Sequence, residues 1–370
     1  MNPAEHSQRT HAGPAPRADS RLAHRGGAVE LLRLPAALFG AAATLRRALY
    51  DASVLPVHKV DVPVVCVGNL STGGTGKTPM CALVADRLAR RGLRPGLLSR
   101  GYGTSHGPND EALLLERLLP GVPHVQDPDR VRGARELVDR GCGSIVLDDG
   151  FQHRRLHRDL DLVLVDATRP WGLPSPPEGG PPVRALLPRG LLREPPSSLS
   201  RADAIVLTRT AQADAAALER LELEIARFAP GRPVLRADHR AARLLDESGA
   251  SHRLESLAGR EVDLASGIGN PESFEKSVRA LGARVRTHRA FPDHHAFEPG
   301  DLSGLGAEGR PLVVTSKDAV KLAAQRAKFL VLEIDLVLLS GEPVLEALLD
   351  SLAPGAQAVE RAALRAGMHG

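Results

Sequence analysis

Residues 68–78 read Gly-Asn-Leu-Ser-Thr-Gly-Gly-Thr-Gly-Lys-Thr and decide the fold class. They follow the apolar run PVVCVG (63–68) and precede a helical pattern that starts near Pro79. Glycines let backbone N–H groups turn toward phosphate oxygens, and the start of a helix adds positive charge there. Ser71 stands where the usual eight-residue pattern has glycine, so the strict motif fails by one residue. The order of strand, loop and helix still predicts a nucleotide-phosphate loop formed by Ser71, Thr72, Gly73, Gly74, Thr75, Gly76, Lys77 and Thr78.

Two side chains of this loop carry chemistry. Lys77 is expected to reach the β- and γ-phosphate oxygens of ATP, and the Thr78 hydroxyl is expected to bind Mg²⁺. The acidic partner of such a loop follows an apolar strand, and SIVLDD (144–149) is the best match. Asp148 or Asp149 should therefore hold Mg²⁺ directly or through water. The alternative is that these are turn carboxylates, because Asp-Gly is also common in turns.

Alternating apolar and helical segments follow the loop. The runs RPGLLSRG (94–101), GSIVLDDG (143–150) and DLVLVDA (161–167) predict strands, and the segments between them predict crossover helices. The fold class is therefore α/β, with a P-loop NTPase-like parallel sheet. A second alternation from Glu261 (VDLASG, SFEKSVRALG, PLVVTS, FLVLEIDL) predicts a smaller α/β domain. The Pro-rich segment 170–196 is too long for an ordinary connection and is expected to meet substrate.

These patterns divide the chain into five parts. Residues 1–27 lack apolar periodicity and are expected to be a disordered tail, 28–55 form an amphipathic helix, and 56–235 form the P-loop core. Residues 236–260 are expected to be linker strands around a turn, and 261–370 the smaller α/β domain.

Composition excludes several classes of protein. Of 370 residues, 42% are hydrophobic and 25% charged, as in a globular protein. The net charge of +4 suggests a nucleic-acid partner, but only 3% of the residues are aromatic and the scattered basic residues are nearly all arginine, so none is expected. Cys66, Cys81 and Cys142 form no CxxC pair, which favours reduced thiols over a metal site.

The segment from Val29 to Tyr50 allows three interpretations. Leucines recur at helical spacing among basic residues, which is typical of an amphipathic basic helix. A signal peptide is rejected, because a following ATP loop has little to bind in an exterior compartment. A helix docked on the protein's own core and a helix lying in a membrane interface remain, the second favoured by leucines on one face and arginines for anionic head groups.

Beyond the loop, further motifs occur in an order that resembles the tetraacyldisaccharide 4'-kinase family, the lipid A 4'-kinases. They are SRGYG (99–103), Asp110-Glu111, DDGFQH (148–153), LPRGLLREP (187–195), GIGNP (267–271), Asp293-His294 and TSKDAVK (315–321). The family's segment around Lys317 often has glutamate where this chain has Ser316. The resemblance covers most of the chain.

This resemblance implies an activity and a location. The ATP γ-phosphoryl group would pass to the 4'-hydroxyl of tetraacyldisaccharide 1-phosphate, a glycolipid, in lipid A biosynthesis. The expected site is the cytoplasmic face of the inner membrane, with the protein peripheral or anchored by its N-terminal helix, and a monomer is expected.

The resemblance also implies roles for individual residues. Asp110 would be the catalytic carboxylate, with His294 as its partner across the cleft and Lys77 as the third catalytic residue; an N-cap is the alternative for Asp110, because ALLLERLL follows it. Gln152 would help Thr78, Asp148 and Asp149 hold Mg²⁺. Contacts to ATP or lipid phosphates would come from arginines, each of which could instead be a solvated surface residue, and His153 could face substrate or pack. The candidates for contacts to substrate are Arg100, Arg130, Arg189, Arg193 and His153.

Three other functions fit the sequence less well. A membrane-associated P-loop switch ATPase shares the GGxGKT loop, but its signature lysine position is Thr72 here. A phosphoesterase metal cluster at Asp293, His294 and His295 would need further ligands after early strands. Gly267-Ile268-Gly269 suggests a dinucleotide turn only weakly, since the third glycine position is Glu272; a tight strand-to-helix turn is the better interpretation.

Overall fold

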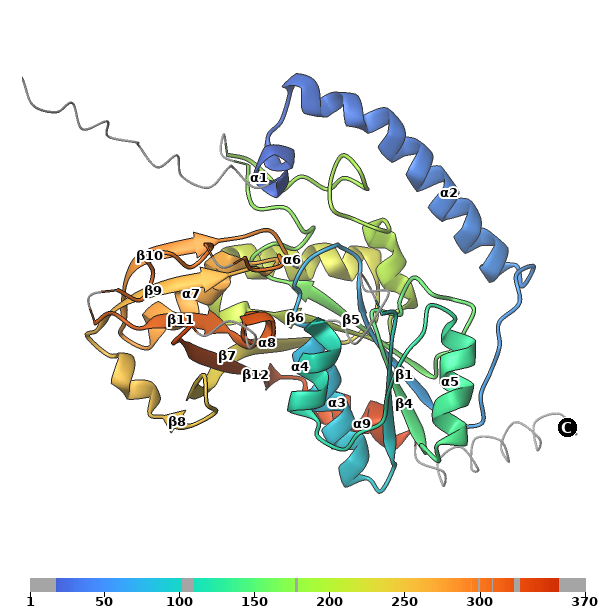
Figure 1. The fold of residues 1–370 in the computed structure, drawn as a ribbon. Coiled ribbons are helices and arrows are strands. Elements are labelled where there is room, and N and C mark those ends of the chain that lie inside the picture. Colours follow the sequence, from blue (N-terminus) through green and yellow to red (C-terminus); the bar gives the residue numbers. More distant parts are fainter. Residues whose placement is uncertain are drawn as a thin grey trace, which may run out of the picture.

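The computed structural model describes residues 18–101, 110–176, 179–293, 295–298, 300–307, 309–322 and 327–352. Their strands form one twelve-stranded sheet in the order β10-β9-β11-β12-β7-β6-β5-β1-β4-β2-β3, with β8 paired to β7 (Figure 1). The pairs are parallel except those of β7 with β12 and β8. The α/β fold with a mostly parallel sheet, predicted from the sequence, is confirmed.

The first lobe contains β1 to β6 and the helices that cover them. Its strands are buried along almost their whole length because α3 and α9 cover one face and α5 and α6 the other. The strands are β1 (Val64–Asn69), β2 (Pro95–Ser99), β3 (His124–Gln126), β4 (Ser144–Asp148), β5 (Leu160–Asp166) and β6 (Ala204–Thr208). The helices are α3 (Lys77–Arg90), α4 (Asp110–Leu118), α5 (Arg130–Asp139), α6 (Ala215–Phe228) and α9 (Glu342–Asp350), with η2 (Pro196–Arg201) and η3 (Thr210–Gln212).

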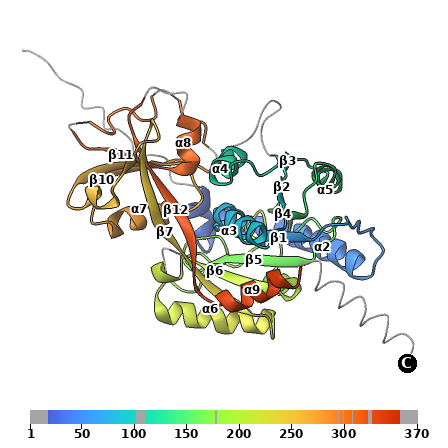
Figure 2. The same cartoon turned by 90° about the horizontal axis from the view of Figure 1, so that it is seen from below.

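The second lobe is joined to the first by a long antiparallel ribbon, which Figure 2 shows running between them. The ribbon consists of β7 (Val234–Asp246) and β12 (Leu330–Ser340). Helices α7 and α8 contribute to two hydrophobic clusters of the second lobe. This lobe comprises β8 (Ser251–His252), η4 (Leu254–Leu257), β9 (Glu261–Ser266), α7 (Pro271–Ala280), β10 (Arg284–Ala290), β11 (Leu312–Thr315) and α8 (Ser316–Leu322).

The lobes are less separate than the sequence division suggests. Residues 236–260 contain most of β7, which pairs with β6 on one side and β12 on the other, so the sheet is continuous. The predicted turn in this segment is the hairpin between β7 and β8. Helix α9 lies within the range given to the smaller domain but packs on the first lobe. There Leu345 and Leu349 join the core of Leu88 and Leu235, and Arg91 pairs with Glu346.

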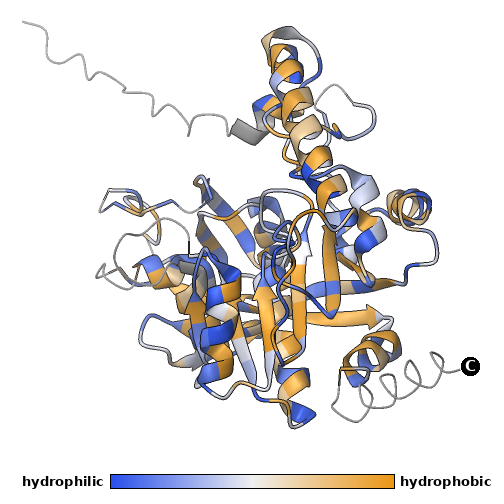
Figure 3. Cartoon of the chain, turned by 90° about the vertical axis from the view of Figure 1, so that its right-hand side faces the viewer, coloured by the Kyte–Doolittle hydropathy of each residue, from blue (hydrophilic) through white to orange (hydrophobic). Residues whose placement is uncertain are grey.

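The N-terminal part forms α1 (Ala18–Ala23), η1 (Gly27–Leu32) and α2 (Arg33–Asp51). Helix α2 runs along one side of the molecule and projects from it (Figures 1 and 3). Only Ala36 of α2 is buried, whereas Leu34 and Leu38 are 72% and 66% exposed. Residues Gly27–Asp51 are long and apolar enough to cross a membrane by length and composition. The predicted helix is therefore present, and Leu34, Leu38 and Leu45 are not covered by the described residues.

Candidate active site

The phosphate loop joins β1 to α3 as predicted, and α3 begins at Lys77. Gly73 and Gly76 have φ of 115° and 92°, which favour glycine. Thr75 is buried, and hydrogen bonds hold both its side chain and its backbone. Its hydroxyl accepts from Asn69 Nδ2 at 3.0 Å, and its carbonyl accepts from Thr208 Oγ1 at 2.9 Å. The loop is thus fixed by the ends of β1 and β6, the two strands on either side of β5.

The Pro-rich segment 170–196 docks along this loop. Thr72 N donates to Leu191 O at 2.8 Å, and Arg193 N donates to Leu70 O at 2.7 Å. These backbone bonds bring the side chain of Arg193 next to the loop. The segment therefore lies beside the phosphate loop, and its contact with substrate stays a prediction.

Asp149 lies between two cations of the site. Its Oδ2 accepts from Arg193 Nη1 at 2.7 Å, and its Oδ1 is 3.6 Å from Lys77 Nζ. Burial, the largest influence, would raise the pKa of Asp149, but Lys77 and Arg193 together outweigh burial and lower it. The carboxylate is therefore ionised and points at the start of α3. Its φ of 53° is unusual for a residue other than glycine and turns the chain sharply after β4.

Two cavities meet at this carboxylate. One, of about 220 Å³, is lined by loop residues 73–79, by Leu114 of α4 and by residues of the second lobe. The other, of about 950 Å³, lies between the Pro-rich segment, residues 152–154 and α2. Four residues line both cavities: Gly73, Asp149, Arg193 and Asp293. A group bound on the phosphate loop in the smaller cavity would therefore adjoin a second molecule in the larger one.

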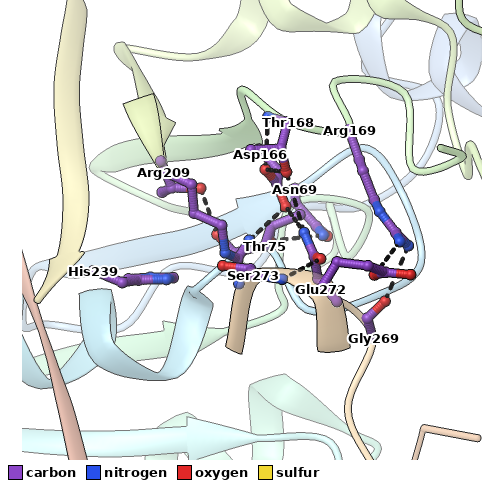
Figure 4. A network of polar contacts seen from close by, with 12 residues as sticks. Asn69, Thr75, Asp166, Thr168, Arg169, Arg209, His239, Gly269, Glu272 and Ser273 are labelled. Carbon is purple, nitrogen blue, oxygen red and sulfur yellow. Dashed lines mark hydrogen bonds and ion pairs between the residues drawn. The ribbon is translucent and has the colours of Figure 1, made fainter. Parts of the chain in front are cut away.

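A buried polar cluster holds the second lobe against the phosphate loop (Figure 4). Asp166, at the end of β5, accepts from Asn270 Nδ2 at 3.0 Å and from Arg209. Asn270 also caps α7 by accepting from Ser273 N at 3.1 Å. Next to Asn270, a Cβ on Gly269 would lie 2.4 Å from Gly74 N, so the turn touches the loop backbone. The GIGNP segment is thus the predicted strand-to-helix turn.

The comparisons with known proteins fit this geometry. Residues 28–353 match the family model described as Tetraacyldisaccharide-1-P 4'-kinase. The chain belongs to this family. The family resemblance and the kinase activity expected from the sequence are thereby confirmed, and the switch ATPase is not favoured.

Individual relatives agree with the family match. The chain is similar to the tetraacyldisaccharide 4'-kinase of Anaeromyxobacter dehalogenans, with 44% identity over 86% of this chain and 89% of the relative. A relative of the same name from Chromobacterium violaceum is 38% identical over 85% of this chain and 91% of its own. Among solved structures, LpxK from Aquifex aeolicus, in an "apo" form in complex with ATP, is 32% identical, with a TM-score of 0.66 over 86% of this chain and 98% of that one.

The structure brings many of the predicted residues of this kinase together. Lys77, Thr78, Asp149 and Arg193 line the smaller cavity, while Arg100, Gln152 and His153 line the larger one. Burial lowers the pKa of His153 to about 4, so the imidazole is neutral at neutral pH. Gln152 Nε2 donates to Asn69 O at 2.8 Å, which fixes the amide.

Arg189 is not brought to the site, contrary to the prediction for it. It is buried, and its Nη1 and Nη2 donate to Leu22 O and His24 O at 2.8 and 2.9 Å. Its Nη2 also pairs with Glu30 at 2.7 Å. It lines neither cavity, and its contacts anchor the N-terminal segment.

The two aspartates of the predicted metal pair have different environments. Asp148 is the last residue of β4, is buried and lines neither cavity. It lies beside Cys81 of α3, and it raises the pKa of that thiol, after the larger effect of burial. Asp149 alone of the two faces both cavities. The strand ends at Asp148, and the left-handed conformation of Asp149 turns its side chain toward the cavities.

Two predicted catalytic residues need separate mention. His294 lies outside the described residues. The backbone of Asp110 opens α4, which contacts α8 of the second lobe, and Leu114 and Leu118 of α4 line the smaller cavity. The N-cap and the catalytic interpretation of Asp110 both place it at this end of the helix. Among the described residues, no group of three or more His, Cys, Asp or Glu side chains could hold a metal.

Sequence reasoning missed other residues of the site. Arg209 and His239 line the smaller cavity, and burial lowers the pKa of His239 to about 3. Lys317 Nζ is 3.0 Å from Asp293 Oδ1, where both border the smaller cavity. The sequence contains a signal for two of these residues, since Arg209 follows the strand AIVLT and Lys317 belongs to a family motif. No rule of sequence spacing, however, predicts that either residue lies beside the phosphate loop.

Proposed function

We propose that this kinase transfers the γ-phosphoryl group of ATP to the 4'-hydroxyl of tetraacyldisaccharide 1-phosphate, forming the 4'-phosphorylated lipid A precursor. The observation that carries the proposal is the meeting of the two cavities at Gly73, Asp149, Arg193 and Asp293. ATP would occupy the smaller cavity on the phosphate loop, and the glycolipid headgroup would occupy the larger one. The γ-phosphate would then face the acceptor hydroxyl at the shared residues.

The chain's own residues supply the positioning that phosphoryl transfer needs. Backbone N–H groups of residues 73–78 and the start of α3 would hold the phosphates, and Lys77 and Arg193 would neutralise charge on the transferred group. Both cations pair with Asp149 before substrate binds. Binding of the nucleotide would exchange part of this pairing for phosphate oxygens.

A Mg²⁺ ion fits the donors at this position. Asp149 Oδ1 accepts no hydrogen bond from the described residues, and Thr78 lines the same cavity. Carboxylate, hydroxyl and amide oxygens are ligands that Mg²⁺ prefers. Asp149 and Thr78 would hold the ion directly, and Gln152 and Asp148 would contact it through water. When bound, it would neutralise charge on the β- and γ-phosphate oxygens.

The proton of the acceptor hydroxyl would move to Asp110, with His294 supporting that carboxylate from the second lobe. Closure of the lobes around the γ-phosphate would exclude water from it. We expect Asp110→Ala to lower kcat by roughly 10²- to 10⁴-fold with little change in ATP affinity. An unchanged kcat would contradict the assignment.

The membrane surface is the second part of the proposal. The exposed leucines of α2 would lie in the acyl boundary at the cytoplasmic face of the inner membrane. The acyl chains of the substrate could then stay in the bilayer while its sugars enter the larger cavity, one wall of which includes Phe39 and Ala42 of α2.

The test is transfer of labelled γ-phosphate from ATP to tetraacyldisaccharide 1-phosphate in mixed micelles, with Lys77→Ala as the inactive control. We expect labelled product from the unchanged chain only, and its identification as the 4'-phosphate. Hydrolysis of ATP without labelling of the lipid would refute the proposed acceptor.

A further inference from the structure

The lining of the larger cavity has more cationic side chains than are needed to neutralise one transferred phosphoryl group. Its lining contains three carboxylates, from Asp149, Glu194 and Asp293. Its arginines outnumber them: Arg46, Arg47, Arg100, Arg130, Arg154, Arg193 and Arg201. Such an excess in one concave space favours an anionic ligand.

Several of these arginines have other roles. Arg193 pairs with Asp149 where the cavities meet. Arg201 pairs with Glu194 and lies 4.3 Å from the centre of the Phe151 ring, and the buried Arg130 donates to Asp127 O at 2.8 Å. These three arginines are therefore engaged with other residues of the protein and are set aside as ligands of a further anion.

A second group lies where α2 meets residues 152–154. Arg46 and Arg154 both lie over the Tyr50 ring, 5.6 and 5.3 Å from its centre, and Arg47 lines the cavity beside them. None of these residues lines the smaller cavity, on the phosphate loop. We call Arg46, Arg47 and Arg154 the α2 arginine group.

The group is held in place by the protein itself. Arg46 Nη1 donates to Gln152 O at 3.2 Å, and Arg154 Nη1 donates to Arg47 O at 3.3 Å and pairs with Asp51 at 2.5 Å. In these hydrogen bonds Arg46 and Arg154 each use one nitrogen, whereas a guanidinium has five N–H donors in a planar fork. Fixed forks of this kind suit phosphate oxygens.

We infer that the α2 arginine group binds the 1-phosphate of the acceptor, an inference that rests on the proposed function. The acceptor has two functional ends on different sugars, the 4'-hydroxyl and the 1-phosphate. With the hydroxyl at the shared residues, the other end extends along the same cavity toward α2. The exposed leucines of α2 set the depth of this helix at a membrane surface, so its arginines lie at the level of lipid phosphates.

The experiment measures kcat/KM for two acceptors, tetraacyldisaccharide 1-phosphate and the same lipid with a free 1-hydroxyl. Micelles of a neutral detergent remove anionic head groups as competing ligands. The variant is Arg46→Gln with Arg154→Gln. The matched control is Arg155→Gln, because Arg155 is exposed, pairs with Asp129 and lines neither cavity. A second control, Asp51→Asn, breaks the pairing of Arg154 without removing a cation.

We expect the double variant to lose roughly 10- to 100-fold in kcat/KM for the 1-phosphate acceptor, as for loss of charge-assisted hydrogen bonds. Its kcat/KM for the 1-hydroxyl acceptor should stay within about twofold of the unchanged chain, so the preference between acceptors collapses. Arg155→Gln and Asp51→Asn should keep the preference.

Three results would overturn the inference. An equal loss on both acceptors would make the arginines supports of α2 and not phosphate ligands. An unchanged preference, together with weaker binding of the variant to anionic vesicles, would assign the arginines to membrane head groups. If the unchanged chain labels neither acceptor while it hydrolyses ATP, the proposed function fails and the inference fails with it.

Discussion

Replacing Asp166 with alanine tests whether the buried cluster at the ends of β5 and β6 joins the two lobes. The side chains of Asp166 and Arg209 are only 4% and 7% exposed. Asp166 also accepts from Thr168 N and Oγ1 at 2.9 and 2.7 Å and from Asn270 Nδ2 at 3.0 Å. Alanine would leave the Arg209 charge buried without its counter-ion.

The expected cost follows from this geometry. Removing one partner of a buried ion pair lowers the free energy of unfolding by about 3–5 kcal/mol. Asp166→Asn keeps an oxygen in place and should cost less, about 1.5–3 kcal/mol. Because Asp166 holds Asn270, whose neighbour Gly269 touches the phosphate loop, KM for ATP should rise in both variants.

Urea unfolding followed by circular dichroism measures the stability, and steady-state kinetics measures KM. A third variant, Asp166→Leu with Arg209→Met, removes both charges and should be more stable than Asp166→Leu alone by at least about 1 kcal/mol. A loss below about 1 kcal/mol in Asp166→Ala, or a double variant no better than the single one, would refute the reasoning.

Three further predictions concern the loop, the histidines and α2. Gly269→Ala places a Cβ 2.4 Å from Gly74 N and should weaken ATP binding roughly tenfold by calorimetry, whereas Gly300→Ala, which meets nothing within 4 Å, should not. Lowering the pH from about 6.5 to 4 should reduce the free energy of unfolding measured by urea titration, because histidines bind protons in the unfolded chain over this range while the buried imidazoles of the folded chain stay neutral. Each such histidine contributes at most about 1.4 kcal/mol per unit of difference between its folded and unfolded pKa values. Normal pKa values in the folded chain would give no such loss. These histidines, with folded pKa values of about 4, 4 and 3, are His124, His153 and His239. Leu34→Ser with Leu38→Ser should lower binding to vesicles of anionic lipid at least about tenfold in sedimentation assays, and equal binding would contradict a membrane role for these exposed leucines.

Local features of the chain could be predicted because their causes are local. The apolar run before Gly68, the glycines of the loop and the helical spacing after Lys77 are enough to define β1, the loop and α3. The same holds for the strand that ends at Asp148. Which of Asp148 and Asp149 faces the cavities could not be predicted, because it depends on where the strand ends and on the left-handed turn at Asp149.

Features that depend on distant pairing were not visible in the sequence. The ribbon of β7 and β12 joins segments about ninety residues apart, and its pairing makes one sheet from what the alternation presents as two domains. Arg189 could not be distinguished from Arg193 by the text of their shared motif. In the folded chain the N-terminal segment places Glu30 beside Arg189, whereas Arg193 pairs with Asp149.

The position of α9 has a consequence for synthesis of the chain on the ribosome. Leu345 and Leu349 complete the core that contains Leu88 and Leu235, so this core stays open while the second lobe is translated. About 110 residues separate Leu235 from Leu345, which at roughly 5–20 residues per second is a delay on the order of 10 s. During that time the face of the sheet that α9 covers is exposed, and the nascent chain at this stage is the form most in need of a chaperone.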